Sequence, residues 1–465
     1  MSDTSVRDRL RRLRAAWNGT LPASDGQVKA VEGDLRSAEE ALLTAQRHIA
    51  ALTARVAALE ARLARVASEH SAPPSPLRLA YFSPLTPEAT GIAGYSEMLL
   101  PALARLAEVD VYVGDVTPTD PFVNRLPVFP TTQYAARRDA RAYHATIYHM
   151  GNFRGYHAAI FAVMQRSPGI LVLHDFLLHH FFAGIHLDGG RADDYPWEVG
   201  YAEGTPGMAV ARAALRGERP LPLFDYPLVQ RALDLSQGVI CHSDYVRRQV
   251  AALRPDLPTA VVGLATTPSY RKPPAEIGQG DAERPFRIIT AGYLTPAKGL
   301  ETALQAFALF RQTRPNARYT LVGNVEPGFD LDGLIQQTGV ADAVEVRGYA
   351  PTLDEFDRTI ADADVCLNLR YPTAGETSAS LLRVMAVGVP SVVTDVGWFS
   401  ELPDDTAIKV SAPPTAADVA GALEALVADP ARRLGMADGG QRYVAAVHSP
   451  AASARGYVEF VGQLL

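Results

Sequence analysis

The chain has 465 residues, 48% of them apolar and 20% charged, which is too long for one ordinary domain and ample for packed cores. Its net charge of -7 argues against a nucleic-acid surface, because phosphate binding needs concentrated Lys and Arg. No apolar run has the length of a signal peptide or a membrane span, so we expect a cytoplasmic protein, with peripheral attachment to a membrane left open. Cys241 and Cys366 end predicted buried strands, which favours a core role in a reducing compartment over a disulfide or a metal site.

An uninterrupted heptad pattern occupies residues 28–66, within a helical segment that we assign to residues 1–70. A lone helix cannot bury such a seam, so the pattern predicts a coiled coil and a homo-oligomer formed through residues 28–66. The alternative is a single helix packed on the rest of the chain. Ala38 and Ala45 weaken the seam and would permit close antiparallel packing. The apolar positions are Val28, Val31, Leu35, Ala38, Leu42, Ala45, Ile49, Leu52, Val56, Leu59, Leu63 and Val66.

After a proline-containing linker at residues 71–76, short apolar runs alternate with predicted helices, which is typical of a parallel α/β domain. We assign residues 77–272 to a first Rossmann-like domain on the acceptor side. The stretch from about 188 to 222 is rich in Gly, Pro and Arg and is predicted to be an irregular insertion. The expected strands are residues 77–82, 110–113, 145–148, 169–173 and 238–241.

A second linker ends near residue 283, and residues 284–440 form a second Rossmann-like domain on the donor side. Residues 441–465 are predicted to form a C-terminal helix that can cross back to the first domain. Two doubly wound domains bind a ligand in the cleft between them, at the carboxyl ends of the strands. The expected strands of the second domain are residues 286–292, 319–323, 344–348, 364–369 and 391–394.

The most informative segment follows the strand at residues 364–369. The chain breaks at Pro372 and Gly375 and then presents Glu376, Thr377 and Ser378 where a helix begins. A strand, a polar turn and a helix N-terminus in this order hold an anionic ligand in α/β proteins. A helix cap is the simpler explanation, but capping and ligand binding are compatible. The segment therefore predicts a nucleotide-sugar site, with Glu376 on donor hydroxyls and the two hydroxyl residues near the diphosphate.

Lys298 lies in another turn between a strand and a helix, flanked by Gly292 and Gly299. Taken alone, a lysine is most often a surface residue. In this turn an ammonium can meet phosphate oxygens and neutralise the charge that grows on a leaving diphosphate. We therefore expect Lys298 to be a catalytic residue and Gly292 to lie in the donor site.

From about Leu77 onward the chain resembles the retaining glycosyltransferases of family 4, which have the GT-B fold. Residues 82–96, with Gly91 and Gly94, resemble the first strand and the glycine-bearing loop of that family. Residues 291–299 resemble its G-R-x-x-x-x-K-G segment. Residues 375–390 lie where the family has an E-x(7)-E motif and a trailing M-A-x-G-x-P, which is intact here. The order and spacing of all three segments agree with the family.

The resemblance implies transfer of a sugar from a nucleotide-diphosphate donor to an unknown acceptor, with retention of configuration, in surface polysaccharide or other glycan biosynthesis. It implies attack on the same face as the leaving phosphate, with no enzymatic nucleophile, no metal and no other cofactor. It places the backbone at Gly91 and Gly94 near the diphosphate, His174 as a catalytic residue at the donor sugar and Tyr349 at the base. Turn glycines, a structural histidine and a core aromatic residue are the respective alternatives.

Two positions depart from the family pattern. Tyr293 replaces the arginine that precedes the lysine, and Arg370 could supply the missing charge. Arg383 occupies the position of the second glutamate, and Glu376 lies one place after the first. An arginine only donates hydrogen bonds, so either Glu376 takes over the binding of donor hydroxyls or the nucleoside is held differently. We retain Glu376 as a catalytic candidate and Arg370 and Arg383 as donor-binding candidates.

Two other function classes agree with the same sequence. One is a GT-B epimerase, which alters a nucleotide sugar without any acceptor. The other is a scaffold protein with a degenerate nucleotide site, whose function depends on the coiled coil and not on catalysis. Retention of Lys298 and Glu376 argues against the scaffold, whereas Tyr293 and Arg383 favour it.

Overall fold

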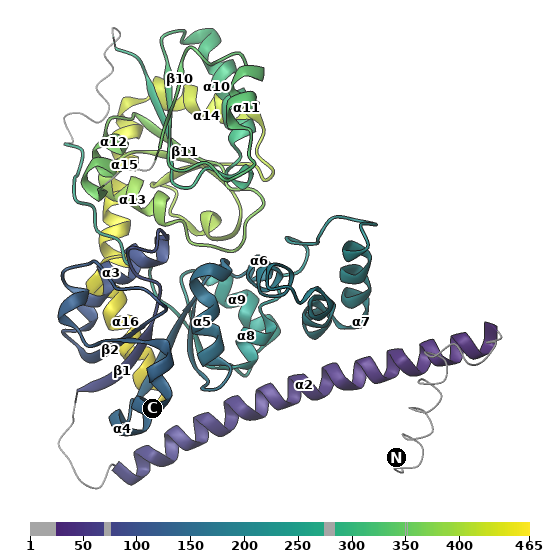
Figure 1. Ribbon diagram of the computed structural model, residues 1–465. Helices are drawn as coiled ribbons and strands as arrows, with labels where there is room; N and C mark the ends of the chain where they lie inside the picture. Colours follow the sequence, from purple (N-terminus) through teal and green to yellow (C-terminus); the bar gives the residue numbers. More distant parts are fainter. Residues whose placement is uncertain (1–24, 69–75, 274–283, 349, 351) are drawn as a thin grey trace, which may run out of the picture. The chain divides into compact units, whose positions relative to one another are not determined.

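A computed structural model describes residues 25–68, 76–273, 284–348, 350 and 352–465 (Figure 1). The chain divides into two compact units, which are described separately. The larger unit comprises residues 60–151, 155–176 and 236–465, and the smaller one residues 1–59, 152–154 and 177–235. Among the described residues, no helix has both the length and the apolar character needed to cross a membrane.

The larger unit contains two parallel sheets. The first has seven strands in the order β3-β2-β1-β4-β5-β6-β7. Its core strands are nearly continuous apolar runs, as expected for strands covered on both faces. All five strands predicted for this sheet are confirmed to within three residues, whereas β3 and β7 are too short to give a pattern. The strands are β1 (Leu77–Phe82), β2 (Ala107–Val113), β3 (Val128–Pro130), β4 (Ala145–Met150), β5 (Gly169–Leu173), β6 (Ser236–Cys241) and β7 (Thr259–Val261).

The second sheet has six parallel strands in the order β10-β9-β8-β11-β12-β13. All five strands expected in this domain are present, and β13 is an additional one. Cys366 in β11 and Cys241 in the first sheet are buried and free, in agreement with a core role. The strands are β8 (Arg287–Ala291), β9 (Arg318–Val322), β10 (Val344–Arg347), β11 (Val365–Asn368), β12 (Ser391–Thr394) and β13 (Ala407–Val410).

Helices connect most of the parallel strands, because a parallel neighbour can be reached only by a crossover connection. The helices of the larger unit are α3 (Gly91–Leu103), α4 (Tyr134–Arg141), α5 (Arg154–Met164), α9 (Asp244–Leu253), α10 (Leu300–Thr313), α11 (Leu331–Gln337), α12 (Leu353–Ala361), α13 (Ala379–Val387), α14 (Ala416–Ala428), α15 (Pro430–Val447) and α16 (Pro450–Leu464).

The C-terminal helix α16 packs on the first sheet domain, although it follows the second one in sequence (Figure 1). The hydroxyl groups of Tyr457 in α16 and Tyr95 in α3 are 2.7 Å apart and buried. Gly238 in β6 leaves the space that Phe460 fills, because a Cβ there would lie 2.9 Å from the phenyl ring. These contacts attach the end of the chain to the first domain.

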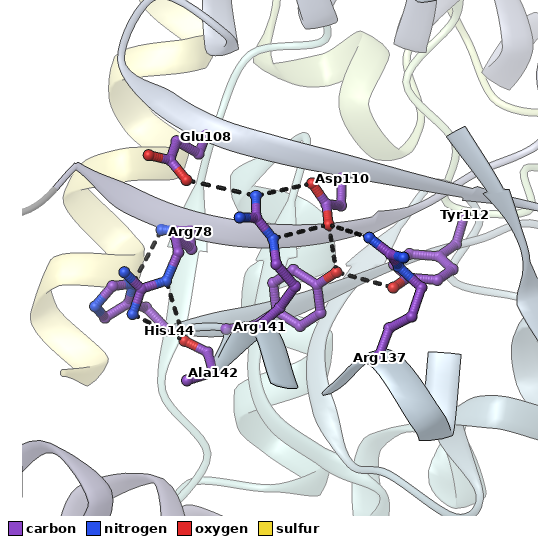
Figure 2. Close-up of polar contacts among 9 residues, drawn as sticks. Arg78, Glu108, Asp110, Tyr112, Arg137, Arg141, Ala142 and His144 are labelled. Carbon is purple, nitrogen blue, oxygen red and sulfur yellow. Dashed lines mark hydrogen bonds and ion pairs between the residues drawn. The ribbon is translucent and has the colours of Figure 1, made fainter. Parts of the chain in front are cut away.

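A polar network fastens α4 to β2 in the first domain (Figure 2). The carboxylate of Asp110, which is buried, accepts two hydrogen bonds of 3.1 Å from Arg141 and one of 2.6 Å from the hydroxyl of Tyr143. Arg137 lies 3.6 Å from the same carboxylate and stacks over Phe129, with its guanidinium carbon 3.4 Å from the ring centre. The network satisfies a buried charge away from the strand ends, so we interpret it as structural.

The smaller unit joins residues 25–59 of the N-terminal helix α2 (Asp25–Ser68) to the segment that follows β5. That segment contains α6 (His179–Ala183), α7 (Tyr195–Leu215) and α8 (Gln230–Asp234). The sequence assigned the N-terminal helix and this segment to different domains, but their contacts group them. The linker expected at residues 71–76 lies almost wholly outside the described residues.

The expectation of irregular structure at residues 188–222 is wrong for most of that stretch. Residues 195–215 form α7, which contains a kink at Gly204, with φ of 70°, followed by Pro206. Glycine tolerates this backbone conformation, and proline is accepted where a new helical turn begins. The two residues that broke the helical pattern in the sequence therefore mark a kink within a helical segment.

Candidate functional site

Both sheets reverse their strand order beside their first strand, with β1 between β2 and β4 and β8 between β9 and β11. Ligands of open α/β sheets bind outside the carboxyl ends of the strands at such a reversal. In the second domain, the two segments that leave this point carry Lys298 after β8 and Arg370 after β11. The topology therefore brings together two residues that the sequence separates widely.

Lys298 is 5% exposed, and its ammonium donates to the carbonyl oxygen of Ala291 and lies 3.5 Å from Oγ of Ser380. Burial, followed by the nearby charge of Arg370, lowers the pKa of this lysine to about 7. A buried ammonium with so few acceptors is stabilised by any anion placed beside it. Lys298 is thus prepared to interact with a negatively charged group.

Gly292 keeps the backbone close to this ammonium. Its φ is 99°, and a Cβ at this position would lie 2.9 Å from Nζ of Lys298 and 3.1 Å from Cβ of Ser380. Any larger residue would displace the lysine or the start of α13. The glycine expected from the sequence is therefore required by both its conformation and its neighbours.

The helix α13 begins at the polar turn, as predicted. Ser378 is the N-cap, and its hydroxyl accepts a hydrogen bond of 3.2 Å from the backbone amide of Leu381. Asn368 at the end of β11 lies 3.4 Å from the same hydroxyl. The hydroxyl of Thr377 donates to the carbonyl oxygen of His242, which follows β6, over 3.3 Å. The N-terminal amides of α13 form a partial positive charge next to Lys298.

Glu376 and Arg370 form an ion pair with 2.6 Å between Oε1 and Nε. The other carboxylate oxygen of Glu376 accepts hydrogen bonds from the amide of Ala374, at 2.8 Å, and the hydroxyl of Thr373, at 3.0 Å. The side chain of Glu376 is 12% exposed and that of Arg370 is 22% exposed. The sequence did not predict this pair, which places a second cation near Lys298.

Arg383 lies in α13 but makes a different contact. Its guanidinium pairs with Asp357 of α12 over 2.6 Å, and both side chains are buried. The other oxygen of Asp357 accepts from the amide and the hydroxyl of Ser269, at 2.6 and 2.7 Å. The structure therefore joins Arg383 to the α12 and Ser269 contacts and not to the pair formed by Arg370 and Glu376.

In the first domain, Gly91 and Gly94 lie in the first turn of α3 and not in a loop. Thr90 caps this helix, and its hydroxyl accepts from the amide of Ile92. No neighbouring atom lies within 4 Å of a Cβ built on either glycine. The helix start therefore presents backbone without side chains, beside the carboxyl end of β1.

His174 follows β5 and is buried in a cluster of rings. Its Nε2 is 3.0 Å from Nδ1 of His149, and its ring centre is 5.1 Å from that of Tyr95 and 4.8 Å from that of His242. Burial, followed by the charges of the neighbouring histidines, holds the pKa of His174 well below its usual value. A neutral imidazole can exchange hydrogen bonds but does not supply a positive charge near neutral pH.

The segment after His174 contacts the polar turn of the second domain. A Cβ on Gly375, whose φ is 76°, would lie 2.6 Å from Cβ of Phe176. Together with the bond from Thr377 to the carbonyl of His242, this contact brings the carboxyl ends of β5 and β6 to the turn before α13. Residues predicted from two separate domains thus meet at one place.

Two of the tyrosines considered from the sequence are not placed in the site, and two polar residues of the site were not predicted. Tyr349 lies outside the described residues. Tyr293, which occupies the position of the family's arginine, is half-exposed and carries no positive charge, so it does not take over the role of that arginine. Ser380 and Asn368 were not predicted, although Ser380 follows the N-cap serine by two residues and a hydroxyl there can face the same ligand. Within the described part of the chain, no three His, Cys, Asp or Glu side chains are arranged to hold a metal ion.

Comparison with known families accounts for this geometry. Residues 275–443 match the family model described as glycosyl transferases group 1. This part of the chain therefore resembles a group 1 glycosyltransferase domain. This domain includes Lys298, Arg370 and Glu376, so the cluster around the start of α13 belongs to the matched region.

Curated relatives match over shorter stretches. The amylovoran biosynthesis glycosyltransferase AmsK of Erwinia amylovora is 30% identical over 124 residues, which are 26% of this chain and 30% of that protein. The D-inositol 3-phosphate glycosyltransferase of Arthrobacter sp. strain FB24 is 34% identical over 175 residues, 36% of this chain and 40% of that protein. The chain therefore spans less than half the length of these relatives.

Solved structures resemble the chain over most of its length. Sucrose-phosphate synthase from Thermosynechococcus elongatus has a TM-score of 0.56 at 17% identity, covering 83% of this chain and 99% of that one. Anabaena Alr3699/HepE in complex with UDP and glucose has a TM-score of 0.56 at 16% identity, with the same coverage. These likenesses and the two parallel sheets confirm the predicted GT-B fold.

Proposed function

We propose that this glycosyltransferase moves a sugar from a nucleotide-diphosphate donor to a glycan acceptor, with retention of anomeric configuration. The observation that carries the proposal is the buried ammonium of Lys298, which lies 3.5 Å from Oγ of Ser380 in the first turn of α13 and whose pKa is lowered by the charge of Arg370 as well as by burial. Burial of an unpaired positive charge in this position is unfavourable in free energy unless an anion binds beside it. A diphosphate supplies two negative charges and fits a helix start and two basic side chains.

Each residue has a distinct part in this proposal. Lys298 and Arg370 neutralise the diphosphate as the glycosidic bond breaks, so the stabilisation is greatest when the leaving charge is fully developed. Glu376 holds Arg370 and offers its carboxylate to donor hydroxyls. Ser378 and Ser380 present hydroxyls beside the phosphates. The leaving phosphate accepts the proton of the acceptor hydroxyl, so the reaction needs no nucleophile from the protein.

The relatives suggest the direction of the substrate search. The name of AmsK refers to biosynthesis of amylovoran, and the HepE structures contain UDP, glucose or UDP-glucose. We therefore place UDP-sugars first among donors and surface polysaccharide precursors first among acceptors. The proposed location is the cytoplasm, where nucleotide sugars are made.

Thermal unfolding with UDP, GDP, ADP, TDP and CMP tests donor binding. A ligand at a hundred times its dissociation constant adds about 2.7 kcal/mol of stability, which raises the melting temperature by several degrees. We expect one nucleoside diphosphate to stabilise the wild type and to lose its effect on Lys298→Ala. Failure of every nucleotide would favour the scaffold alternative.

Product analysis then tests the reaction. With the stabilising base attached to several sugars, NMR of the released sugar or product gives the configuration at the anomeric carbon. Retention of the donor configuration and release of the nucleotide support the proposal. An altered sugar still attached to its nucleotide would show the epimerase activity instead.

A further inference from the structure

The helix α2 uses one face to pack on its own chain. Leu43, which is 4% exposed, lies among Tyr201 and Met208 of α7. The carboxylate of Glu39 pairs with Arg212 over 2.6 Å. Arg47 donates a hydrogen bond of 2.5 Å to the carbonyl oxygen of Tyr201. This docked face is closed to other partners in the described part of the helix.

The heptad seam lies on a different face of the same helix and remains exposed. In the heptad, the seam occupies the a and d positions, whereas Glu39, Leu43 and Arg47 occupy e, b and f. Six large apolar side chains of the seam are between 47% and 64% exposed, and Ala38 and Ala45 between them are also exposed. The six are Leu35, Leu42, Ile49, Leu52, Val56 and Leu59.

This exposure is more than scattered surface hydrophobicity. Soluble proteins rarely leave a continuous apolar stripe open to water, and such a stripe marks an interaction surface. The sequence analysis left open whether the helix packs on its own chain or on a partner. Among the described side chains, intramolecular packing uses the other face and leaves the seam exposed from Leu35 to Leu59.

We propose that the seam pairs with the seam of a second copy of this chain, in an antiparallel two-stranded coiled coil centred on Arg47. The positions of the seam are symmetric about this residue. Antiparallel pairing in full overlap sets Leu35 against Leu59 of the second copy and Leu42 against Leu52. A helix that is complementary to itself in this way needs no foreign partner.

The two alanines determine the orientation. The antiparallel register sets Ala38 against Val56 and Ala45 against Ile49, so each small side chain meets a β-branched one. A parallel dimer would set each alanine against its own copy and leave two thin layers in the core. Poorly filled layers lose packing contacts, which favours the antiparallel arrangement.

Light scattering of the full chain after size exclusion tests the dimer. At about 20 μM we expect twice the chain mass of 50.0 kDa. The double variant Ile49→Glu with Leu52→Glu places two charges in the centre of the seam and should give a single chain mass. The matched control Ser37→Glu with Thr44→Glu adds the same charge at exposed positions outside the seam and should remain dimeric. A monomeric wild type, or a seam variant that stays dimeric, overturns the proposal.

Cysteine crosslinking tests the orientation. Both native cysteines are buried, so introduced cysteines give the oxidation signal. Ala45→Cys mixed with Ile49→Cys should form a disulfide between chains, because these residues share a layer only in the antiparallel register. Ala45→Cys alone should not crosslink. Efficient crosslinking of that single variant would show a parallel dimer and refute the register. Nucleotide stabilisation of every variant, measured in parallel, shows that the catalytic domains are folded and separates this test from that of the proposed function.

Discussion

Arg370 and Glu376 form an ion pair within the single segment that connects β11 to α13. Because the backbone of the same turn also donates to Glu376, the carboxylate is fixed and in turn fixes the guanidinium. Arg370 is close enough to Lys298 to lower the pKa of its ammonium. The pair therefore offers a physical replacement for the arginine that Tyr293 does not supply.

The first prediction concerns this replacement. Arg370→Ala should weaken binding of the stabilising nucleoside diphosphate roughly 10- to 100-fold, because a charge-assisted hydrogen bond contributes about 1.5–3 kcal/mol. Glu376→Ala should also weaken binding. The loss of binding free energy in the double variant should be smaller than the sum of the losses in the two single variants. Titration calorimetry measures all three. The control is Arg358→Ala, which removes an exposed arginine paired within α12 and should have no effect. Additive losses for Arg370 and Glu376 would contradict the coupling.

The second prediction concerns pH. Burial and Arg370 lower the pKa of Lys298 to about 7 in the free protein, whereas a bound diphosphate favours the ammonium and raises it. Donor binding should therefore take up a proton, and the affinity should fall by up to about tenfold per pH unit above pH 7. Below pH 7 the lysine is already charged, and the affinity should level off.

Calorimetry of a nucleotide sugar in buffers of different ionisation enthalpy measures this proton uptake directly. A nucleotide sugar is preferable to a free nucleoside diphosphate, whose terminal phosphate titrates in the same range. Lys298→Met should bind more weakly and lose the slope. A wild-type affinity that is constant from pH 6 to pH 8.5 would show that Lys298 stays charged without a ligand.

The third prediction uses glycine geometry. Gly292→Ala should abolish donor binding, because its Cβ would lie 2.9 Å from Nζ of Lys298 and displace the ammonium. Gly328 is a matched control, since its φ of 85° is equally strained for alanine but its Cβ would meet no atom within 4 Å. Both variants should lose about 1–2 kcal/mol of stability from the positive φ, and Gly292→Ala should lose more because its Cβ would also lie 3.1 Å from Cβ of Ser380. Only the first should lose nucleotide stabilisation in thermal unfolding. Equal binding by both would show that the lysine tolerates the displacement.

The fold was largely predictable because its signals are local. Apolar runs such as residues 77–82 and 169–173 alternate with helices, and this alternation gives parallel sheets directly. The turn around Lys298 and the capped start of α13 are also encoded by neighbouring residues. Strands of three residues, such as β3 and β7, do not contain enough positions to show a pattern.

The contacts that were missed are those between distant parts of the sequence. Arg383 occupies a motif position, but its partner Asp357 lies on another helix, and no local pattern joins them. The hydrogen bond between His149 and His174 depends on adjacent strand ends. The heptad pattern identified the seam of α2 but gave no sign of the face around Leu43, because one short patch of contacts has no period.

The last prediction tests a residue that we assign to structure and not to function (Figure 2). Asp110 is 1% exposed and is the common acceptor for Arg141 and Tyr143. Burial raises the pKa of Tyr143, and the hydrogen bond to Asp110 raises it further because it stabilises the protonated phenol. Asp110→Ala removes this acceptor, while Arg141 keeps Glu108 at 3.4 Å and Tyr143 keeps the hydroxyl of Tyr112 at 2.8 Å. Removal of one partner of a buried ion pair lowers the free energy of unfolding by about 3–5 kcal/mol. Because Arg141 is 37% exposed and water screens its charge, we expect a smaller loss of about 1–3 kcal/mol.

Urea unfolding measures this loss as a lower midpoint with an unchanged slope. Asp139→Ala is the control, because Asp139 pairs with Arg138 on the surface, is 81% exposed and should change stability by less than about 0.5 kcal/mol. Nucleotide binding should be normal in both variants when they are measured well below their unfolding midpoints. If Asp110→Ala instead retains its stability and loses donor binding, the network at β2 and α4 acts on the site, and its structural interpretation fails.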